Sequence, residues 1–256
     1  MKSKQYFLKF FPIDSFYQNL FSFLIKLVFG SGRFLQDLFQ PDSVDLIELE
    51  SNEGKELLVN SSSRLNYELL YNNFQSQDKF NYCGVATTAI ILNAFRLSFT
   101  HSRHDLASDI TQKEVFEDKI KPKLFFKDIF LGLSLKDLEQ LLEAYSLNTE
   151  MHYADESLGL EEFRSLAAST IDKPDSFVIV NYWRGSLNQK GWGHISPLGA
   201  YSSEIDSFLI IDVASSRYPS FWVKTKMLYS AIKVREFVLF GRPRGLLLVS
   251  RNKLFQ

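Results

Sequence analysis

The chain has 256 residues, of which 45% are hydrophobic, and a formal net charge of -1 at pH 7. This length suits one large domain or two small ones, and the apolar content is high enough to build a core, so disorder is not the default expectation. The balanced charge gives no sign of a nucleic-acid surface. The single cysteine excludes a disulfide framework and a multi-thiolate metal site, so it is either a buried structural thiol or a catalytic one.

Residues 1–45 form an N-terminal extension rich in Phe and Leu. From Phe16 to Phe39 the apolar residues recur at helical spacing, which predicts one or two amphipathic helices. Lys9 and Lys26 interrupt the apolar run, so it fits neither a secretory signal nor a membrane span of about 20 residues. We expect this segment to pack on its own domain or on a second copy in a homodimer, with attachment to a membrane surface as the alternative.

Residues 46–256 form the second part of the chain, and helices dominate its first half. The stretch LIELESNEGKELL predicts a strand, a turn at residues 52–54 and a second strand. Helices are expected over SSSRLNYELLYNNFQ, where a serine would cap the helix, and over Cys83–Phe95, HDLASDITQKEVFEDKI and LEEFRSLAAST. The clearest helix is SLKDLEQLLEAYSL, where Ser134 and Asp137 form a capping box in front of a leucine stripe.

The second half of the chain consists mainly of β-rich runs. DSFVIVNYW, GHISPLGAYS and DSFLIIDVA are separated by the turn signals RGSLNQKG and SSEID. FWVKTKMLYSAIK predicts a further helix, and RGLLLVS predicts a last strand. Helices followed by a largely antiparallel sheet predict an α+β fold rather than a doubly wound parallel sheet.

Cys83 stands at the start of a predicted helix in DKFNYCGVATTAIILNAF. A free thiol has a pKa of about 8.5, and a helix N-terminus or a nearby imidazolium lowers this pKa. Gly84 would let a substrate approach the backbone, and the Cys83 N–H is suited to an oxyanion hole. The alternative is a small buried hydrophobe, which is the usual role of a lone cysteine.

A nucleophilic thiol needs a base, and four histidines are available. His101 and His104 lie in HSRH without a further metal ligand nearby, so we expect an exposed helix start there. His152 lies at an apparent strand edge with no sign of function. His194 follows two glycines in GWGHISPLGAY, and a hairpin would place Asp212, at the end of FLIID, beside it. In the alternative, His194 and Asp212 have separate structural partners.

The motifs YCGVA, GHISP and LIIDVA…YP…WV, in this order, resemble the phytochelatin synthases, in particular the short bacterial homologues. The resemblance covers roughly residues 46–251 and is weakest between Arg96 and Lys173. It implies a papain-like cysteine peptidase fold with the cysteine opening the central helix. The family's site residues then fall on Cys83 as the nucleophile, His194 as the base, Asp212 as its orienting partner and Gln77 as an oxyanion donor.

The resemblance also implies substrate contacts. Arg244, in RPRG, matches an arginine that holds a substrate carboxylate, and Glu236 is the candidate for the family's acidic residue upstream of it. Where relatives carry a basic residue three positions after the aspartate, this chain has Ser215. Further candidate substrate contacts are Gly193, Tyr201 and Arg217.

The resemblance implies chemistry on glutathione. The thiolate would cleave the Cys–Gly bond, release glycine and hold γ-Glu-Cys as a thioester for hydrolysis or for transfer to a second glutathione. No cofactor is needed to form this acyl-enzyme, and Cd or Zn glutathione thiolates are candidate activators. Plant relatives have a long cysteine-rich C-terminal region, whereas this chain stops shortly after Arg251 with no second cysteine, so we expect hydrolysis to dominate.

Two other functions stay open at this point. One is a papain-like hydrolase or amidase for other γ-glutamyl peptides, glutathione conjugates or a protein side chain. The other is an inactive binding module. The expected partners are glutathione and γ-glutamyl peptides, not nucleic acid. We expect a soluble protein and favour the cytoplasm over secretion or surface association.

Overall fold

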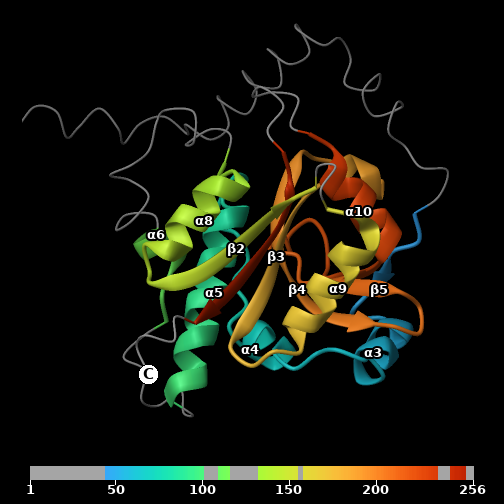
Figure 1. Ribbon diagram of the computed structural model, residues 1–256, viewed down its shortest axis with the longest axis horizontal. Coiled ribbons are helices and arrows are strands. Elements are labelled where there is room, and N and C mark those ends of the chain that lie inside the picture. The colour runs from blue at the N-terminus through green and yellow to red at the C-terminus, as the bar shows by residue number, and fades with distance from the viewer. Residues whose placement is uncertain (1–43, 101–108, 116–131, 155–157, 236–242, 252–256) are drawn as a thin grey trace, which may run out of the picture. The chain divides into compact units, whose positions relative to one another are not determined.

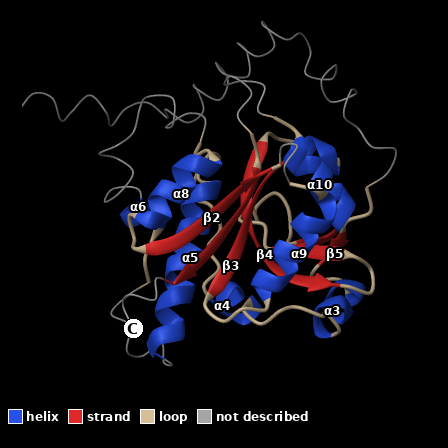
Figure 2. Ribbon diagram, in the orientation of Figure 1, coloured by secondary structure: helices blue, strands red, loops and turns tan. Residues whose placement is uncertain are grey.

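The computed structural model describes residues 44–100, 109–115, 132–154, 158–235 and 243–251 (Figures 1 and 2). Within these ranges seven strands form one antiparallel sheet in the order β1-β6-β5-β4-β3-β7-β2. The strands are β1 (Ile47–Glu48), β2 (Leu147–Tyr153), β3 (Ser176–Trp183), β4 (Gly193–Ser202), β5 (Ser207–Ile210), β6 (Phe221–Lys224) and β7 (Gly245–Arg251).

Helices cover both faces of the sheet, with α5 and α8 on one side and α9 and α10 on the other (Figures 1 and 2). A large buried cluster joins α4, α5 and α8 to one face, and a second joins α9 and α10 to the other. The helices are α3 (Asn52–Val59), α4 (Tyr67–Asn72), α5 (Cys83–Thr100), α6 (Gln112–Val115), α8 (Leu135–Glu143), α9 (Leu160–Ile171), α10 (Thr225–Lys233) and the 3-10 helix η3 (Arg184–Leu187).

The expected α+β fold with an antiparallel sheet in the second half of the chain is confirmed. The sequence of β3 is a nearly continuous apolar run because this central strand is buried on both faces, and β4 beside it is buried along most of its length. The capping box of α8 is present, with the Ser134 hydroxyl accepting from the backbone of Asp137. FWVKTKMLYSAIK is only partly helical, because its first four residues form β6 before α10 begins.

The prediction of strand, turn and strand over LIELESNEGKELL is wrong after the first strand. Residues 52–59 form α3 instead, because the Ser51 hydroxyl accepts a hydrogen bond from the Gly54 N–H at 3.0 Å and caps a new helix. Gly54 is required by a close approach rather than by a turn, since a Cβ there would lie 2.0 Å from the carbonyl oxygen of Glu48. The cap from Ser51 therefore favours a helix over the turn that was predicted at residues 52–54.

Two other helix predictions differ from the structure. The serines of SSSRLNYELLYNNFQ do not cap α4, whose N-cap is Asn66; Ser63 forms a β-bridge with Tyr201 instead. Of HDLASDITQKEVFEDKI, only the four residues of α6 are described as helix. The predictions for residues 1–43 and for His101 and His104 lie outside the described residues.

Candidate active site

The β4–β5 hairpin brings His194 and Asp212 together, and a bulge in β4 makes this contact possible. Tyr201 pairs with Phe208, but the register shifts by one residue between Leu198 and Ala200. Past this shift the Ile211 N–H donates to the Pro197 carbonyl at 3.0 Å, which sets Asp212 opposite Ser196. Residues opposite each other, and residues two apart, share a face, so Asp212 faces the same way as His194. An unbulged hairpin would turn Asp212 to the other face.

The His194 ring is held through one nitrogen. Its Nε2 lies 2.9 Å from Oδ1 of Asp212 and 3.0 Å from the Ser196 hydroxyl oxygen. With Nε2 donating to the carboxylate, Nδ1 is left as the nitrogen that faces the thiol of Cys83, to which His194 is hydrogen-bonded. The structure thus brings together Cys83, His194 and Asp212, the three residues that the sequence assigned to catalysis.

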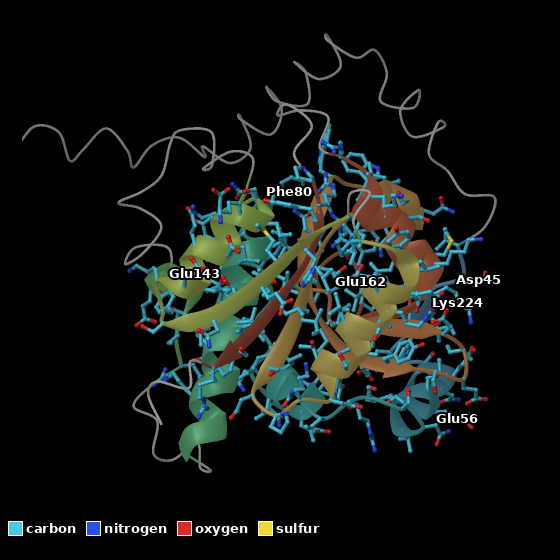
Figure 3. The ribbon with its side chains drawn as sticks, viewed as in Figure 1. Asp45, Glu56, Phe80, Glu143, Glu162 and Lys224 are labelled. Atoms are coloured by element: carbon cyan, nitrogen blue, oxygen red, sulfur yellow. The ribbon has the colours of Figure 1, made fainter. Side chains whose placement is uncertain are left out.

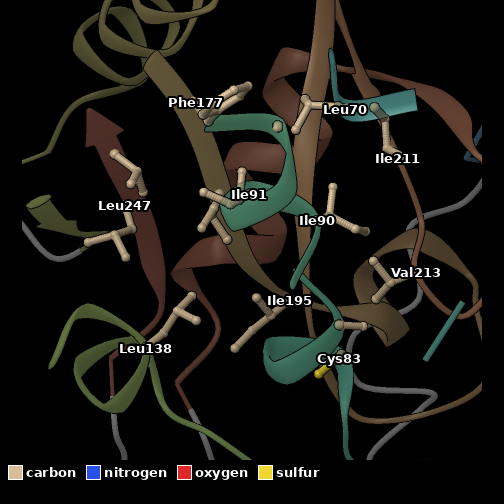
Figure 4. Close-up of a cluster of buried hydrophobic side chains, with 14 of the residues drawn as sticks. Leu70, Cys83, Ile90, Ile91, Leu138, Phe177, Ile195, Ile211, Val213 and Leu247 are labelled. Carbon is tan, nitrogen blue, oxygen red and sulfur yellow. The ribbon is translucent and has the colours of Figure 1, made fainter. Parts of the chain in front are cut away.

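Cys83 is the first residue of α5 and is 8% exposed. Figure 4 shows it at one edge of the large buried cluster, beside Ile195. Burial opposes ionisation, but the hydrogen bond and charge of His194 and the backbone N–H groups of Ile195 and Gly84 outweigh it and lower the pKa of the Cys83 thiol. Cys83 is therefore buried like a structural cysteine yet poised as a thiolate.

We call Cys83, His194 and Asp212 together the relay. The pKa values of its other two members, His194 and Asp212, shift in directions that complement the shift of Cys83. Burial works against the imidazolium, but the charge and hydrogen bond of Asp212, followed by those of Cys83, raise the pKa of His194. Burial also works against the carboxylate, but His194, Arg184 and the Ala214 N–H lower the pKa of Asp212. These directions favour a thiolate–imidazolium pair backed by an ionised carboxylate.

Gly84 has a different role from the one expected. It is buried, and a Cβ there would lie 3.2 Å from Cδ1 of Leu133 and 3.5 Å from Cδ1 of Ile195. The missing side chain therefore allows α5 to pack closely against Leu133 and Ile195, rather than making room for a substrate. The Thr87 hydroxyl, one turn further on, donates to the Ile195 carbonyl at 3.3 Å and ties the helix to β4 beside His194.

Sequence reasoning missed Arg184. This arginine opens η3 directly after β3 and is only 4% exposed. Its Nη2 donates to Oδ1 of Asp212 at 2.8 Å, and the Tyr182 hydroxyl lies 3.4 Å from Oδ2 of the same carboxylate. The available signal was a cation placed immediately after the apolar run FVIVNYW, but its partner Asp212 is distant in sequence.

The side chain of Gln77 is engaged with its own loop. Its Nε2 donates to the carbonyl oxygens of Lys79 and Phe80, each at 2.9 Å, while its backbone N–H donates to Val213 at 2.7 Å. The segment therefore runs beside the loop that follows Asp212. Both amide hydrogens are used in this conformation, so donation to an oxyanion would require one of these bonds to open. The oxyanion role of Gln77 stays a prediction.

Gly193 and Arg244 lie against each other next to His194. A Cβ at residue 193 would fall 2.2 Å from Nη1 of Arg244. The same Nη1 donates to Oδ1 of Asn181 at 2.8 Å, and the guanidinium lies 5.5 Å from the ring centroid of Trp183. Arg244 is 2% exposed, so it stabilises this corner of the sheet from within. A direct contact with substrate stays a prediction.

The remaining substrate candidates are spread over the molecule. Arg217 is exposed and lies 5.4 Å from the ring centroid of Phe80, which is itself 47% exposed (Figure 3). Tyr201 is not brought to the site: it lies seven residues along β4 from His194, about 23 Å away at the usual strand rise. Its hydroxyl donates to Asp206 at 2.9 Å. Glu236 lies outside the described residues.

The described part of the chain contains neither a metal-binding cluster nor a membrane-spanning helix. No group of three or more His, Cys, Asp or Glu side chains gathers there as a metal site. No described helix has the length and apolar character that a membrane span needs. His152, at the edge strand β2, contacts Glu150 at 2.9 Å.

A thiol at the N-terminus of a buried helix, facing a histidine and an aspartate on an antiparallel sheet, is the arrangement of the papain-like cysteine peptidases, which carry out acyl transfer. The phytochelatin synthase family model matches residues 40–246. The chain therefore belongs to the phytochelatin synthase family.

Curated relatives agree with this assignment. The chain is 28% identical to glutathione gamma-glutamylcysteinyltransferase 3 of Lotus japonicus, with 88% of this chain and 46% of that protein aligned. It is 30% identical to glutathione gamma-glutamylcysteinyltransferase 1 of Arabidopsis thaliana (80% and 42% aligned) and 25% identical to the enzyme of that name from Schizosaccharomyces pombe (79% and 48%). The chain thus spans less than half the length of these relatives.

Two solved structures also resemble the chain. Xylellain, a cysteine protease from Xylella fastidiosa, aligns with a TM-score of 0.46 at 9% identity, over 82% of this chain and 88% of that one. The peptidase domain of Streptococcus ComA, a bi-functional ABC transporter, aligns with a TM-score of 0.43 at 15% identity, over 70% and 97%.

Proposed function

We propose that this protein cleaves the Cys–Gly bond of glutathione through a γ-Glu-Cys acyl-enzyme on Cys83. The observation that carries the proposal is the hydrogen-bonded relay of Cys83, His194 and Asp212, with the pKa of the thiol lowered and that of the imidazole raised. The substrate is suggested by the names of the relatives, which are glutathione gamma-glutamylcysteinyltransferases.

In the acylation step the Cys83 thiolate attacks the carbonyl carbon of the cysteinyl residue. The negative charge moves to the carbonyl oxygen, where the N–H of Cys83 is a suitable donor because the first turn of a helix has no intrahelical acceptor for it. Gln77 would add a second donor once its amide leaves the Lys79 or Phe80 carbonyl. His194 then passes its Nδ1 proton to the glycine nitrogen, the C–N bond breaks, and a thioester remains.

In the second step His194 is neutral and acts as the base. Its Nδ1 removes a proton from water or from the amine of a second glutathione as that nucleophile attacks the thioester. The C–S bond breaks and the Cys83 thiolate returns. Water yields γ-Glu-Cys, and the amine yields a phytochelatin, so the fate of the acyl group depends on which nucleophile reaches the site.

The charges near the site suit glutathione, which carries two carboxylates. We assign the first contact with a carboxylate to Arg217, because its guanidinium is exposed above Phe80 on the loop that follows Asp212. Arg244, which lies against Gly193, is the second candidate for a carboxylate contact. Heavy-metal ions would enter as part of the substrate, as Cd or Zn glutathione thiolates, and would act on transfer by presenting glutathione with its own thiol blocked.

The test is a product assay. The purified chain is incubated with millimolar glutathione, with and without cadmium, and the products are separated by chromatography and identified by mass. We expect glycine and either γ-Glu-Cys or γ-Glu-Cys oligomers from the wild type, and none of them from Cys83→Ser. Absence of glycine release from a folded wild-type chain would refute the proposal.

The same assay separates the alternative substrates. An S-alkylated glutathione or another γ-glutamyl peptide replaces glutathione at equal concentration, and the values of kcat/KM are compared. Preference for one of these by an order of magnitude would assign the relay to that substrate instead. An inactive binding module is recognised by Cys83→Ala retaining the biological effect of the wild type.

The N-terminal extension has two proposed uses, formation of a homodimer and attachment to a membrane surface. Deletion of residues 1–42 separates both from catalysis. We expect this deletion to leave glycine release intact, because the relay lies wholly within residues 83–212. Molecular mass in solution and binding to anionic vesicles then report the two uses independently.

A further inference from the structure

Three donors converge on a single oxygen of Asp212. Oδ1 accepts from Nε2 of His194 at 2.9 Å, from Nη2 of Arg184 at 2.8 Å and from the backbone N–H of Ala214 at 2.9 Å. Asp212 is 0% exposed, and Arg184 is almost as deeply buried. The acyl-transfer chemistry uses the contact with His194, but it gives no reason for a second buried cation on the same carboxylate.

Arg184 is held rigidly at this oxygen. Its Nη1 donates to Oε1 of Gln189, a side chain that is itself buried, and its guanidinium lies 4.6 Å from the ring centroid of Tyr218. The Tyr218 hydroxyl in turn accepts from the Lys190 N–H at 2.6 Å and donates to the Lys190 carbonyl at 3.0 Å. The loop after β3 therefore folds around the guanidinium and aims it at Asp212.

Within the group of Cys83, His194, Asp212 and Arg184, the formal charges balance only when Arg184 is counted. Another buried cation near the site, Arg244, lies beside Gly193 and is hydrogen-bonded to Asn181. When Cys83 and His194 form the thiolate–imidazolium pair, Cys83 and Asp212 are negative, while His194 and Arg184 are positive. In the acyl-enzyme the thioester and His194 are both neutral, so Arg184 is the one formal cation left beside Asp212 within this group. A buried carboxylate without a counter-charge would take up a proton or hold His194 protonated, and a protonated His194 is unable to act as the base.

We propose that Arg184 is a positioning residue that acts through Asp212. It is a permanent counter-charge, which keeps the carboxylate ionised and aligned on Nε2 of His194 both when His194 is charged and when it is neutral. The proposal rests on the Cys83–His194–Asp212 site of the proposed function, but it does not depend on glutathione being the substrate.

The other titratable groups around Arg184 do not replace this charge. Tyr182 of β3 faces it 5.8 Å away, and burial raises the pKa of Tyr182 well above its ordinary value, so its hydroxyl stays neutral. Tyr218 stacks on it. Among the described residues, the cations on the flanking loops and on α10, which packs against η3, are exposed and therefore screened by solvent: Lys190, Arg217, Lys226 and Lys233.

Alkylation of Cys83 by iodoacetamide gives a test that needs no substrate. The chain has one cysteine, so the pH dependence of alkylation reports the Cys83 thiolate alone. Arg184→Gln removes the cation, which leaves a net negative site in which a thiolate is harder to form. We expect the midpoint of alkylation to move to higher pH by about one unit, which makes alkylation about tenfold slower below the midpoint.

Three companion variants make the outcome specific. Arg184→Lys keeps the charge and should keep the wild-type midpoint. Gln189→Glu is isosteric, keeps an acceptor for Nη1 and adds a negative charge, so it should move the midpoint in the same direction by less. Arg164→Gln breaks another arginine–carboxylate pair, with Asp206 at the far end of the hairpin, and should leave the midpoint unchanged.

Circular dichroism establishes which variants are folded. A folded Arg184→Gln with the wild-type midpoint overturns the proposal, and so does an Arg184→Lys that shifts as far as Arg184→Gln. If Arg184→Gln does not fold, Gln189→Glu provides the test. An unchanged alkylation midpoint in this isosteric variant would refute the role of Arg184 as a counter-charge to Asp212. Failure of the wild type to cleave glutathione would count against the proposed substrate, but it would leave this test intact.

Discussion

The guanidinium of Arg244 fills the space where a side chain of residue 193 would lie, next to His194. A Cβ on Gly193 would be 2.2 Å from Nη1 of Arg244. The glycine in front of His194 is thus explained by a buried guanidinium rather than by freedom of the imidazole ring. Gly191 is required for two reasons: its φ is 131°, which favours glycine, and a Cβ there would lie 3.2 Å from Cδ of Arg184.

We therefore expect Gly193→Ala to displace Arg244 and to lower kcat/KM for glycine release by about tenfold, with a loss of about 1–3 kcal/mol in the free energy of unfolding from overpacking. Steady-state kinetics and thermal melting check the two effects. Gly159→Ala is the matched control, because a Cβ there meets nothing within 4 Å. Wild-type kinetics in a folded Gly193→Ala would show that the position of Arg244 is not needed for activity.

The pH profile of glycine release should be bell-shaped. Thiolate forms as pH rises through the lowered pKa of Cys83, so the acidic limb should lie below the ordinary thiol value of about 8.5. Imidazolium is lost as pH rises through the raised pKa of His194, so the alkaline limb should lie above the ordinary imidazole value of about 6.5. Measuring kcat/KM across pH tests this order, and a profile that only rises to a plateau above pH 8.5 would contradict it.

Gln77→Ala should lower kcat by about 10²–10³-fold while changing KM little, because an oxyanion donor acts in the transition state. Gln75→Ala is a suitable control: its Nε2 donates to the Ile110 carbonyl at 2.9 Å, so the variant loses a comparable structural bond two residues away. If both variants retain wild-type kcat, the Gln77 amide serves only the Lys79 and Phe80 carbonyls that it contacts in this structure.

The Arg164–Asp206 pair should give an acid-dependent contribution to stability. Hydrogen bonds from Arg164, followed by those from Thr225 and Tyr201, outweigh burial and lower the pKa of Asp206 to about 2. A depressed carboxyl pKa stabilises the fold above the ordinary value of 3.8, and this stabilisation is lost as pH falls through the folded value.

Accordingly, Asp206→Asn should cost about 0.2–1 kcal/mol at neutral pH, as expected of a solvent-screened pair, and this cost should shrink towards zero as pH falls through about 2. Asn tolerates the positive φ of 46° at this position, so the backbone is not strained by the change. Chemical denaturation at several pH values checks whether the free energies of unfolding of the wild type and of Asp206→Asn approach each other at low pH. Glu161→Gln is the control: it removes the exposed partner of Arg164 and should have little effect on stability at any pH. If the stability cost of Asp206→Asn persists unchanged at pH about 2, the ion pair with Arg164 is not its cause.

Local signals in the sequence were reliable where the interaction that forms the element is itself local. The capping box of Ser134 and Asp137 and the leucine stripe behind it lie within one helix, and both are present in the structure. The same kind of reasoning failed at Ser51, where a serine cap and a turn compete over the same few residues and the close contact of Gly54 with Glu48 favours the helix.

Residues that depend on distant partners were harder to assign. Tyr201 was assigned to the substrate site, but its strand carries it to the far end of the hairpin, where it contacts Asp206. Arg184 went unnoticed, since a cation after an apolar strand has no visible partner until the sheet brings Asp212 to it.

By itself, the sequence determined the composition of the relay: one cysteine at a helix start, a histidine in a strand, an aspartate at the end of the next apolar run, and the α+β class. Each of these follows from residue type and local pattern. Only the tertiary structure decided that the three residues meet. A one-residue bulge between Leu198 and Ala200 sets the face on which Asp212 lies. The lowered pKa of the thiol also arises there, because burial, His194 and the backbone N–H groups act together on Cys83 only after the chain has folded.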